Sequence, residues 1–296
     1  MKMEITAATV KELRERTGAG ILDCKKALVA AAGDLEQAID ILRKSGVAKA
    51  AKKAARIAAE GVIVIRVAPG AERAAMVEVN CETDFVTRAD DFKAFAEAVG
   101  GCVLRHRPLD IDSLLRLPLA EGQETVAACC EQLVAKIGEK IQVRRFTWLE
   151  AGSGVLGIYP HGTKIGVLVS MAGGNAEIAR DIAMHIAASR PLCVHESEVP
   201  ADLLAREKEI FAAQAAETGK PPGVVEKIVA GKLQKYKSEV ALLGQAFVKN
   251  PEMRVGKLLA GAGASVRAFQ RFAVGEGLER RVENFAAEVM SQARGR

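Results

Sequence analysis

The segment Thr83-Asp84-Phe85-Val86 is the short stretch of this sequence whose residue types are best suited to contact another molecule. It stands between a β-branched run and a segment of helical periodicity, so we expect a loop that joins a strand to a helix. An aromatic ring beside a carboxylate is the kind of pair that dominates small interface hot spots. The structural alternative is that Thr83 or Asp84 caps the next helix while Phe85 anchors the loop in the core. The residues alone favour this structural interpretation over a partner contact.

The sequence contains none of the common catalytic motifs. A phosphate-binding loop, a nucleophile elbow and the zinc motif H-E-x-x-H are all absent. The run Gly261-Ala-Gly-Ala-Ser265 begins like a dinucleotide fingerprint, but the third glycine is missing and a strand is expected after it, not before it. The 4 histidines and 6 cysteines have no metal-binding spacing, and C-x-x-C does not occur. We therefore expect no enzyme activity, no cofactor and no metal site.

Composition is that of an ordinary globular protein. The sequence is 49% hydrophobic and 27% charged, and its 296 residues are enough for two or three packed units. The net charge of +5 is mild, and only 4% of residues are aromatic, so stacking platforms for nucleic acid are not evident. No apolar run reaches the roughly 18 residues that a membrane helix needs. The first residues resemble neither a signal peptide nor a transit peptide, so we expect a cytoplasmic protein.

Residues 1 to about 46 have the pattern of three short helices. The first has Thr6 as its N-cap and Gly18 as its C-cap, and the third begins at Asp34. The alanine-rich, basic segment Lys49–Arg56 follows. We interpret this segment as a solvated linker helix, with a nucleic-acid-binding helix as the alternative.

From residue 61 the pattern changes to strands. Two stretches, 62–99 and 155–188, each predict a hairpin followed by a helix, and they look like a distant internal repeat. Residues 200–243 instead predict an antiparallel helical hairpin, inserted before the strand pattern resumes near residue 264. The fold class is therefore α+β. The expected domains are residues 1–56, 57–150, 151–280 with the inserted hairpin, and a C-terminal helix at 281–296.

Several segments in order resemble the elongation factor Ts family. The opening, from Ile5 to Gly20, and the segment Glu78-Val-Asn-Cys-Glu-Thr-Asp-Phe-Val86 are similar to the two signatures of that family. Further similar segments are Lys136-Ile-Gly-Glu-Lys-Ile141, Ile182-Ala-Met-His-Ile-Ala-Ala188 and Arg271-Phe-Ala-Val-Gly-Glu-Gly277. The resemblance covers nearly the whole chain.

The resemblance implies a fold and a partner. The fold would be a three-helix, ubiquitin-associated-like N-terminal domain, a two-part α+β core with antiparallel strands, an inserted coiled-coil hairpin and a C-terminal helix. The partner would be elongation factor Tu, the GTPase that carries aminoacyl-tRNA, and the function would be guanine-nucleotide exchange. A one-to-one complex and a dimer of heterodimers both fit the sequence.

The resemblance also implies roles for single residues. Thr83, Asp84, Phe85 and Val86 would form a wedge that dislocates Mg²⁺ from elongation factor Tu. Secondary contacts would come from Lys11, Ile21, Leu22 and His161. No direct contact with nucleic acid is expected on this interpretation. The alternative function is an RNA-binding or ribosome-associated module built on the basic segment Lys49–Arg56.

Overall fold

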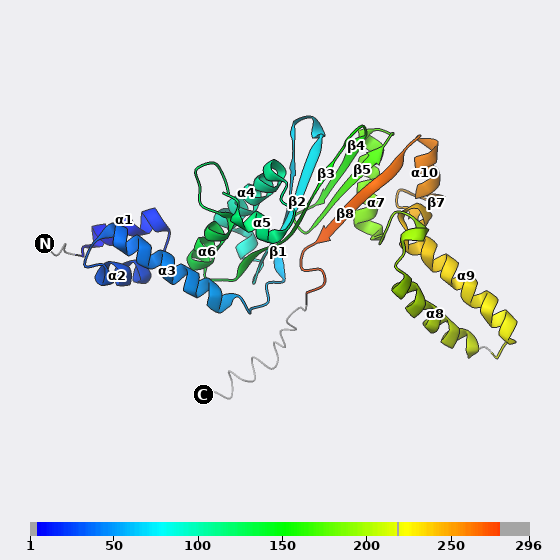
Figure 1. Ribbon diagram of the computed structural model, residues 1–296, viewed down its shortest axis with the longest axis horizontal. Coiled ribbons are helices and arrows are strands. Elements are labelled where there is room, and N and C mark those ends of the chain that lie inside the picture. Colours follow the sequence, from blue (N-terminus) through cyan, green and yellow to red (C-terminus); the bar gives the residue numbers. More distant parts are fainter. Residues whose placement is uncertain (1–4, 218, 279–296) are drawn as a thin grey trace. The chain divides into compact units, whose positions relative to one another are not determined.

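The computed structural model describes residues 5–217 and 219–278 (Figure 1). These residues form helices and antiparallel sheets, which confirms the α+β class. They divide into two compact units. Unit 1 contains the described parts of Met1–Val64, Val77–Phe146 and Val274–Arg296, and unit 2 contains Ile65–Met76 and Thr147–Ala273. The expected C-terminal helix at 281–296 lies outside the described residues.

The chain opens with the three helices α1 (Ala7–Thr17), α2 (Ile21–Ala30) and α3 (Leu35–Lys53). Their ends are set by the expected caps. Thr6 accepts a hydrogen bond from Thr9 N–H, Gly18 has the left-handed conformation at φ 67°, and Asp34 accepts from Gln37 N–H. The helices enclose a small core whose fully buried members include Leu13, Cys24, Leu28 and Ala38.

The third helix is longer than predicted. The basic segment expected as a separate linker helix is largely the end of α3, which continues without a break to Lys53. Gly46, the helix-weakening residue along the way, lies against α6 (Val126–Ile137), where an added Cβ would stand 3.3 Å from the Cβ of Ala135. Because glycine lets the two helices approach closely, packing against α6 offsets its low helix propensity.

The strands β1 (Glu60–Val67), β2 (Arg73–Cys81) and β3 (Ile141–Glu150) form a sheet in the order β1-β2-β3. The helix α4 (Asp90–His106) follows β2, and its buried face includes Phe92, Phe95 and Val99. The short helix α5 (Ile111–Arg116) was not predicted, because six residues are too few to show a helical period.

Unit 2 repeats this order of elements. The strands β4 (Val155–His161), β5 (Ile165–Ala172) and β8 (Ser265–Ala273) form an antiparallel sheet in the order β4-β5-β8. The helix α7 (Ala176–Ser189) packs against β4 and β5. It approaches so closely that an added Cβ on Gly157 would lie 2.1 Å from the carbonyl oxygen of Ala179. A side chain at this position of β4 would therefore push the helix away.

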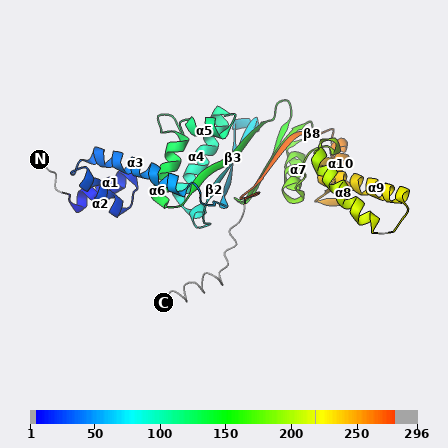
Figure 2. The same ribbon diagram turned by 60° about the horizontal axis from the view of Figure 1, so that its bottom comes forward.

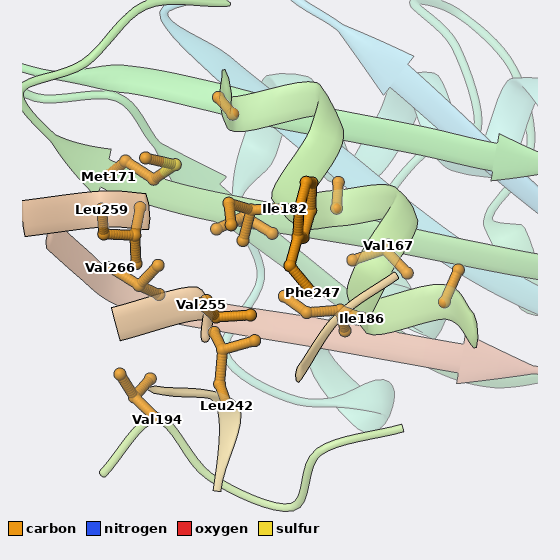
Figure 3. Packing of buried hydrophobic residues seen from close by; sticks show 14 residues of the cluster. Val167, Met171, Ile182, Ile186, Val194, Leu242, Phe247, Val255, Leu259 and Val266 are labelled. Atoms are coloured by element: carbon orange, nitrogen blue, oxygen red, sulfur yellow. The ribbon is translucent and has the colours of Figure 1, made fainter. Parts of the chain in front are cut away.

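The core of unit 2 joins this sheet to elements far along the chain. Figure 3 shows Ile182 and Ile186 of α7 among Val167, Phe247 and Val255. Two of the contributing elements, β6 (Ala246–Phe247) and α10 (Val255–Gly261), were not predicted, because they are short. The strand β7 (Asn250–Arg254), which pairs with β6, was not predicted either.

The inserted segment forms two helices, α8 (Ala201–Ala216) and α9 (Pro222–Val240). They lie side by side as a helical hairpin (Figure 2). The rings of Phe211 and Tyr236 meet edge to face at 6.4 Å, and Lys232 Nζ donates to Gln214 Oε1 at 2.9 Å. An inserted helical hairpin was predicted at this place.

A buried histidine fastens α7 to the segment after the hairpin. Val248 N–H donates to His185 Nδ1 at 3.2 Å, so Nδ1 is the acceptor and Nε2 carries the proton toward Gln245 Oε1 at 2.9 Å. Burial lowers the pKa of His185, although the hydrogen bond with Gln245 opposes this shift. The folded protein therefore favours the neutral form of His185.

This histidine predicts a pH dependence of stability. The folded pKa of His185 lies below the unfolded value of about 6.5. As the pH falls through that value, the unfolded chain therefore binds more protons than the folded chain does. The free energy of unfolding should be greatest above pH ~6.5 and should fall as the solution is acidified toward the folded pKa. Urea unfolding of the wild type and His185→Gln across pH 5 to 7.5 measures this. We expect a smaller pH slope in the variant, and equal slopes would contradict the assignment.

Candidate partner-binding loop

The segment Glu82–Arg88, called the binding loop below, connects β2 to α4. It is an ordered turn. The N–H groups of Thr87, Arg88 and Ala89 donate in succession to the carbonyls of Asp84, Phe85 and Val86, at 3.2, 3.1 and 3.0 Å. Residues Val86–Arg88 thus form one turn of 3-10 helix, and α4 begins directly after it.

Phe85 points into solvent from this turn. Its side chain is 75% exposed, whereas the next residue, Val86, is 7% exposed and fills the core position. The structural interpretation of Phe85 as the core anchor of the loop is therefore wrong. Neither Thr83 nor Asp84 caps α4, because its N-cap is Ala89, without a side-chain hydrogen bond. An exposed ring contributes little to the free energy of folding, so the stability of the fold does not explain why position 85 holds an aromatic residue.

Asp84 and Arg88 flank the exposed ring. Arg88 Nη2 donates to Asp84 Oδ2 at 3.3 Å, and the guanidinium carbon lies 6.0 Å from the centroid of Phe85. Both charged side chains are exposed, and an exposed ion pair is worth only about 0–1 kcal/mol. Asp84 can therefore exchange Arg88 for a group on a partner at little cost. Arg88 was not among the predicted site residues, although its spacing of four residues from Asp84 is a visible signal.

Thr83 holds the other end of the loop in place. Its backbone N–H donates to Glu139 Oε2 at 2.9 Å, and its hydroxyl donates to Glu139 Oε1 at 2.7 Å. Glu139 was also missed, because 56 residues separate it from Thr83. The loop thus presents a carboxylate and an aromatic ring between an anchored threonine and a buried valine.

Comparison with known proteins settles the family. A family model described as Elongation factor TS matches residues 82–276, which is more than half of the chain. The chain belongs to the elongation factor Ts family. The elongation factor Ts of Thioalkalivibrio sulfidiphilus is 58% identical over 296 residues, with 99% of this chain and 100% of the relative covered. Those of Methylococcus capsulatus and Alkalilimnicola ehrlichii are 53% and 50% identical over 292 and 293 residues, covering 99% of this chain and 99% and 100% of the relatives.

These matches confirm the predicted resemblance and make this elongation factor Ts homologue a translation elongation factor. The family model begins at Glu82, the first residue of the binding loop. The three N-terminal helices lie outside that match, but the alignments with the full-length relatives include them.

The remaining predicted contact residues of this elongation factor Ts homologue are exposed. In unit 1, Lys11 on α1 pairs with Glu15 at 3.7 Å, and Ile21 and Leu22 at the start of α2 are 56% and 73% exposed. In unit 2, His161 is the last residue of β4, and its Nδ1 lies 3.3 Å from the hydroxyl of Tyr159. The structure thus brings Thr83, Asp84, Phe85 and Val86 together and assigns His161 to the other unit.

Among the residues that the structure describes, no group of three or more histidine, cysteine, aspartate or glutamate side chains could hold a metal ion. No helix within 5–217 and 219–278 is long and apolar enough to span a membrane.

Proposed function

We propose that this protein is a guanine-nucleotide exchange factor for elongation factor Tu. It would bind the GDP form in the cytoplasm, disturb the site that holds Mg²⁺ and phosphate, and release GDP so that GTP binds during translation elongation. The observation that carries the proposal is Phe85, exposed on an ordered turn beside Asp84. Family membership supports elongation factor Tu as the partner.

The proposed mechanism is differential binding and involves no bond-making step. A factor that binds the nucleotide-free GTPase more tightly than the GDP form must, by linkage, weaken GDP binding by the same ratio. The Phe85 ring would fill an apolar gap in the partner, and Asp84 would compete for the polar groups that hold the Mg²⁺ shell. Thr83 and Val86 would fix the shape of the loop. The protein itself therefore need not be an enzyme.

Further contacts and the finer architecture belong to the same proposal. Lys11, Ile21 and Leu22 would contact the GTPase from the N-terminal helices, and His161 would contact a second region of the partner. The three N-terminal helices would form a ubiquitin-associated-like domain, and α8 and α9 a coiled coil. The proposed domains are residues 1–56, 57–150, 151–280 and 281–296.

The alternative, an RNA-binding or ribosome-associated module, has less support. It depends on the cations of Lys49–Arg56, and two of these already bond within the chain. Lys53 Nζ donates to the carbonyl of Gly138, and Arg56 Nη1 lies 3.3 Å from Glu82 Oε2. An RNA-binding module would show affinity that falls steeply with salt concentration.

Isothermal titration calorimetry tests the linkage directly. The protein would be titrated into elongation factor Tu that is either nucleotide-free or loaded with GDP and Mg²⁺. We expect clearly tighter binding to the nucleotide-free form, and a matching loss of GDP affinity when the factor is bound. Equal affinities for the two forms would rule out exchange by this mechanism, and salt-sensitive binding to RNA alone would favour the alternative.

A further inference from the structure

The turn between α6 and β3 faces the binding loop. It consists of Gly138, Glu139 and Lys140, called the support turn below, and Gly138 ends α6 in the left-handed conformation. Both carboxylate oxygens of Glu139 accept hydrogen bonds from a single loop residue, Thr83, as described above. A carboxylate that accepts from both the backbone and the side chain of one residue restrains its position and its χ1 rotamer together.

A second backbone-to-carboxylate hydrogen bond joins the two segments, with the donor in the support turn and the acceptor in the loop. Lys140 N–H, in the support turn, donates to Glu82 Oε1 at 2.6 Å. Each segment therefore donates a backbone N–H to a glutamate carboxylate of the other: Thr83 N–H to Glu139, and Lys140 N–H to Glu82. Arg56, three residues after the end of α3, reinforces the pair, because its carbonyl accepts from Lys140 Nζ at 2.8 Å and its Nη1 contacts Glu82. Hydrogen bonds to a charged acceptor are roughly twice as strong as neutral ones.

These contacts define how the exposed residues are presented. Asp84 and Phe85 lie between Thr83, held by Glu139, and Val86, buried in the core. Apart from the neighbouring Arg88 side chain, the ring is exposed, so its position depends on the 3-10 turn and on the residues that hold that turn on either side. A binding group that is ordered before its partner arrives avoids the cost of ordering on binding.

We propose that Glu139 is a positioning residue, which holds the Asp84–Phe85 segment in its partner-binding conformation in the free protein. This inference rests on the proposed exchange function and assigns part of it to a residue 54 positions beyond Phe85. Glu139 acts through Thr83, with no contact to the nucleotide required.

The kinetic test uses the full-length protein and elongation factor Tu loaded with a fluorescent GDP analogue. Glu139→Ala should lower the slope of release rate against factor concentration about tenfold, because the loop must then be ordered during binding. Glu139→Gln keeps an oxygen that can accept from Thr83 N–H and should recover most of the activity. Glu121→Ala, which removes the same charge from an exposed position outside the loop, should leave the slope unchanged. Equal losses in Glu139→Ala and Glu121→Ala would overturn the proposal.

A double-mutant cycle separates positioning from a general structural effect. If Glu139 acts through the loop, adding Glu139→Ala to Phe85→Ala should change the slope less than twofold, since the group that it positions is gone. A full tenfold loss in both backgrounds would overturn the proposal.

Amide hydrogen exchange at Thr83 tests the contact without the partner. Exchange should speed up at least tenfold in Glu139→Ala and much less in Glu139→Gln, and unchanged exchange in Glu139→Ala would overturn the proposal. If the wild type fails to accelerate GDP release, the proposed nucleotide-exchange function is wrong. Glu139 then has no role in nucleotide exchange, even if amide hydrogen exchange at Thr83 speeds up in Glu139→Ala. The two failures are thus distinguishable.

Discussion

Replacing Phe85 with alanine is expected to lower the acceleration of GDP release by about 30-fold or more, with little change in thermal stability. The first effect follows because an aromatic anchor at the centre of an interface contributes about 2 kcal/mol or more, and every 1.4 kcal/mol is tenfold. The second follows because the ring is 75% exposed, so its removal leaves no cavity. Release of a fluorescent GDP analogue and a thermal melt on the same sample measure both quantities.

Leu109→Ala is the matched control for this prediction. Leu109 is also apolar, lies in unit 1 and is 93% exposed, but it is outside the binding loop. Truncating it should change neither the release rate nor the melting temperature. A loss of thermal stability in Phe85→Ala comparable to that of a core truncation would show that Phe85 is structural after all. An unchanged release rate would move the wedge to another part of the protein.

Removing the carboxylate of Glu78 is expected to destabilise unit 1 by about 3–5 kcal/mol. Glu78 is fully buried on β2 and accepts hydrogen bonds from Arg144 Nη1 at 3.0 Å, Arg145 Nε at 2.6 Å and Gly275 N–H at 2.8 Å. Glu78→Gln would leave two partly exposed guanidinium groups facing a neutral amide at the fully buried position 78. Urea unfolding followed by circular dichroism measures the change. Glu36→Gln, which breaks the exposed 2.7 Å pair with Arg16, is the control and should cost less than about 1 kcal/mol.

The same site has a defined response to acid. Burial raises the pKa of Glu78, but the Gly275 N–H group and the two arginines outweigh it, and the net pKa lies below the ordinary 4.5. The folded state therefore favours the carboxylate, and its contribution is present above the unfolded pKa and lost as pH falls through the folded value. The wild type should lose more stability than Glu78→Gln on acidification below pH ~4.5. Parallel curves for the two proteins would contradict the assignment.

The elements that could be predicted from sequence are those with local signals. The caps Thr6, Gly18 and Asp34 fall where predicted, because a cap needs only the few residues that follow or precede it. The hairpin-then-helix stretches and the inserted helical hairpin follow from periodicities that extend over ten or more residues. The elements that were missed, such as α5 and α10, have six and seven residues, which are too few to show a helical period.

The candidate loop was identified from its residue types together with the family resemblance, but its conformation could not be predicted from either. A phenylalanine next to a strand end is compatible with core packing or with exposure. In the structure Val86 occupies the core position, and Phe85 is therefore exposed. The pairing of Thr83 with Glu139 has no sequence signal, since the two residues meet through the fold across 56 positions. The same is true of Glu78 and Gly275, which are 197 positions apart.

The central claim is that this protein speeds GDP release from elongation factor Tu. The most direct measurement mixes elongation factor Tu, loaded with a fluorescent GDP analogue, with excess unlabelled GDP and a sub-stoichiometric amount of this protein in a stopped-flow instrument. An exchange factor predicts release of all the bound analogue at a rate that rises with factor concentration, because each factor molecule acts repeatedly. Release at the spontaneous rate, with folded protein and active elongation factor Tu, would contradict the account.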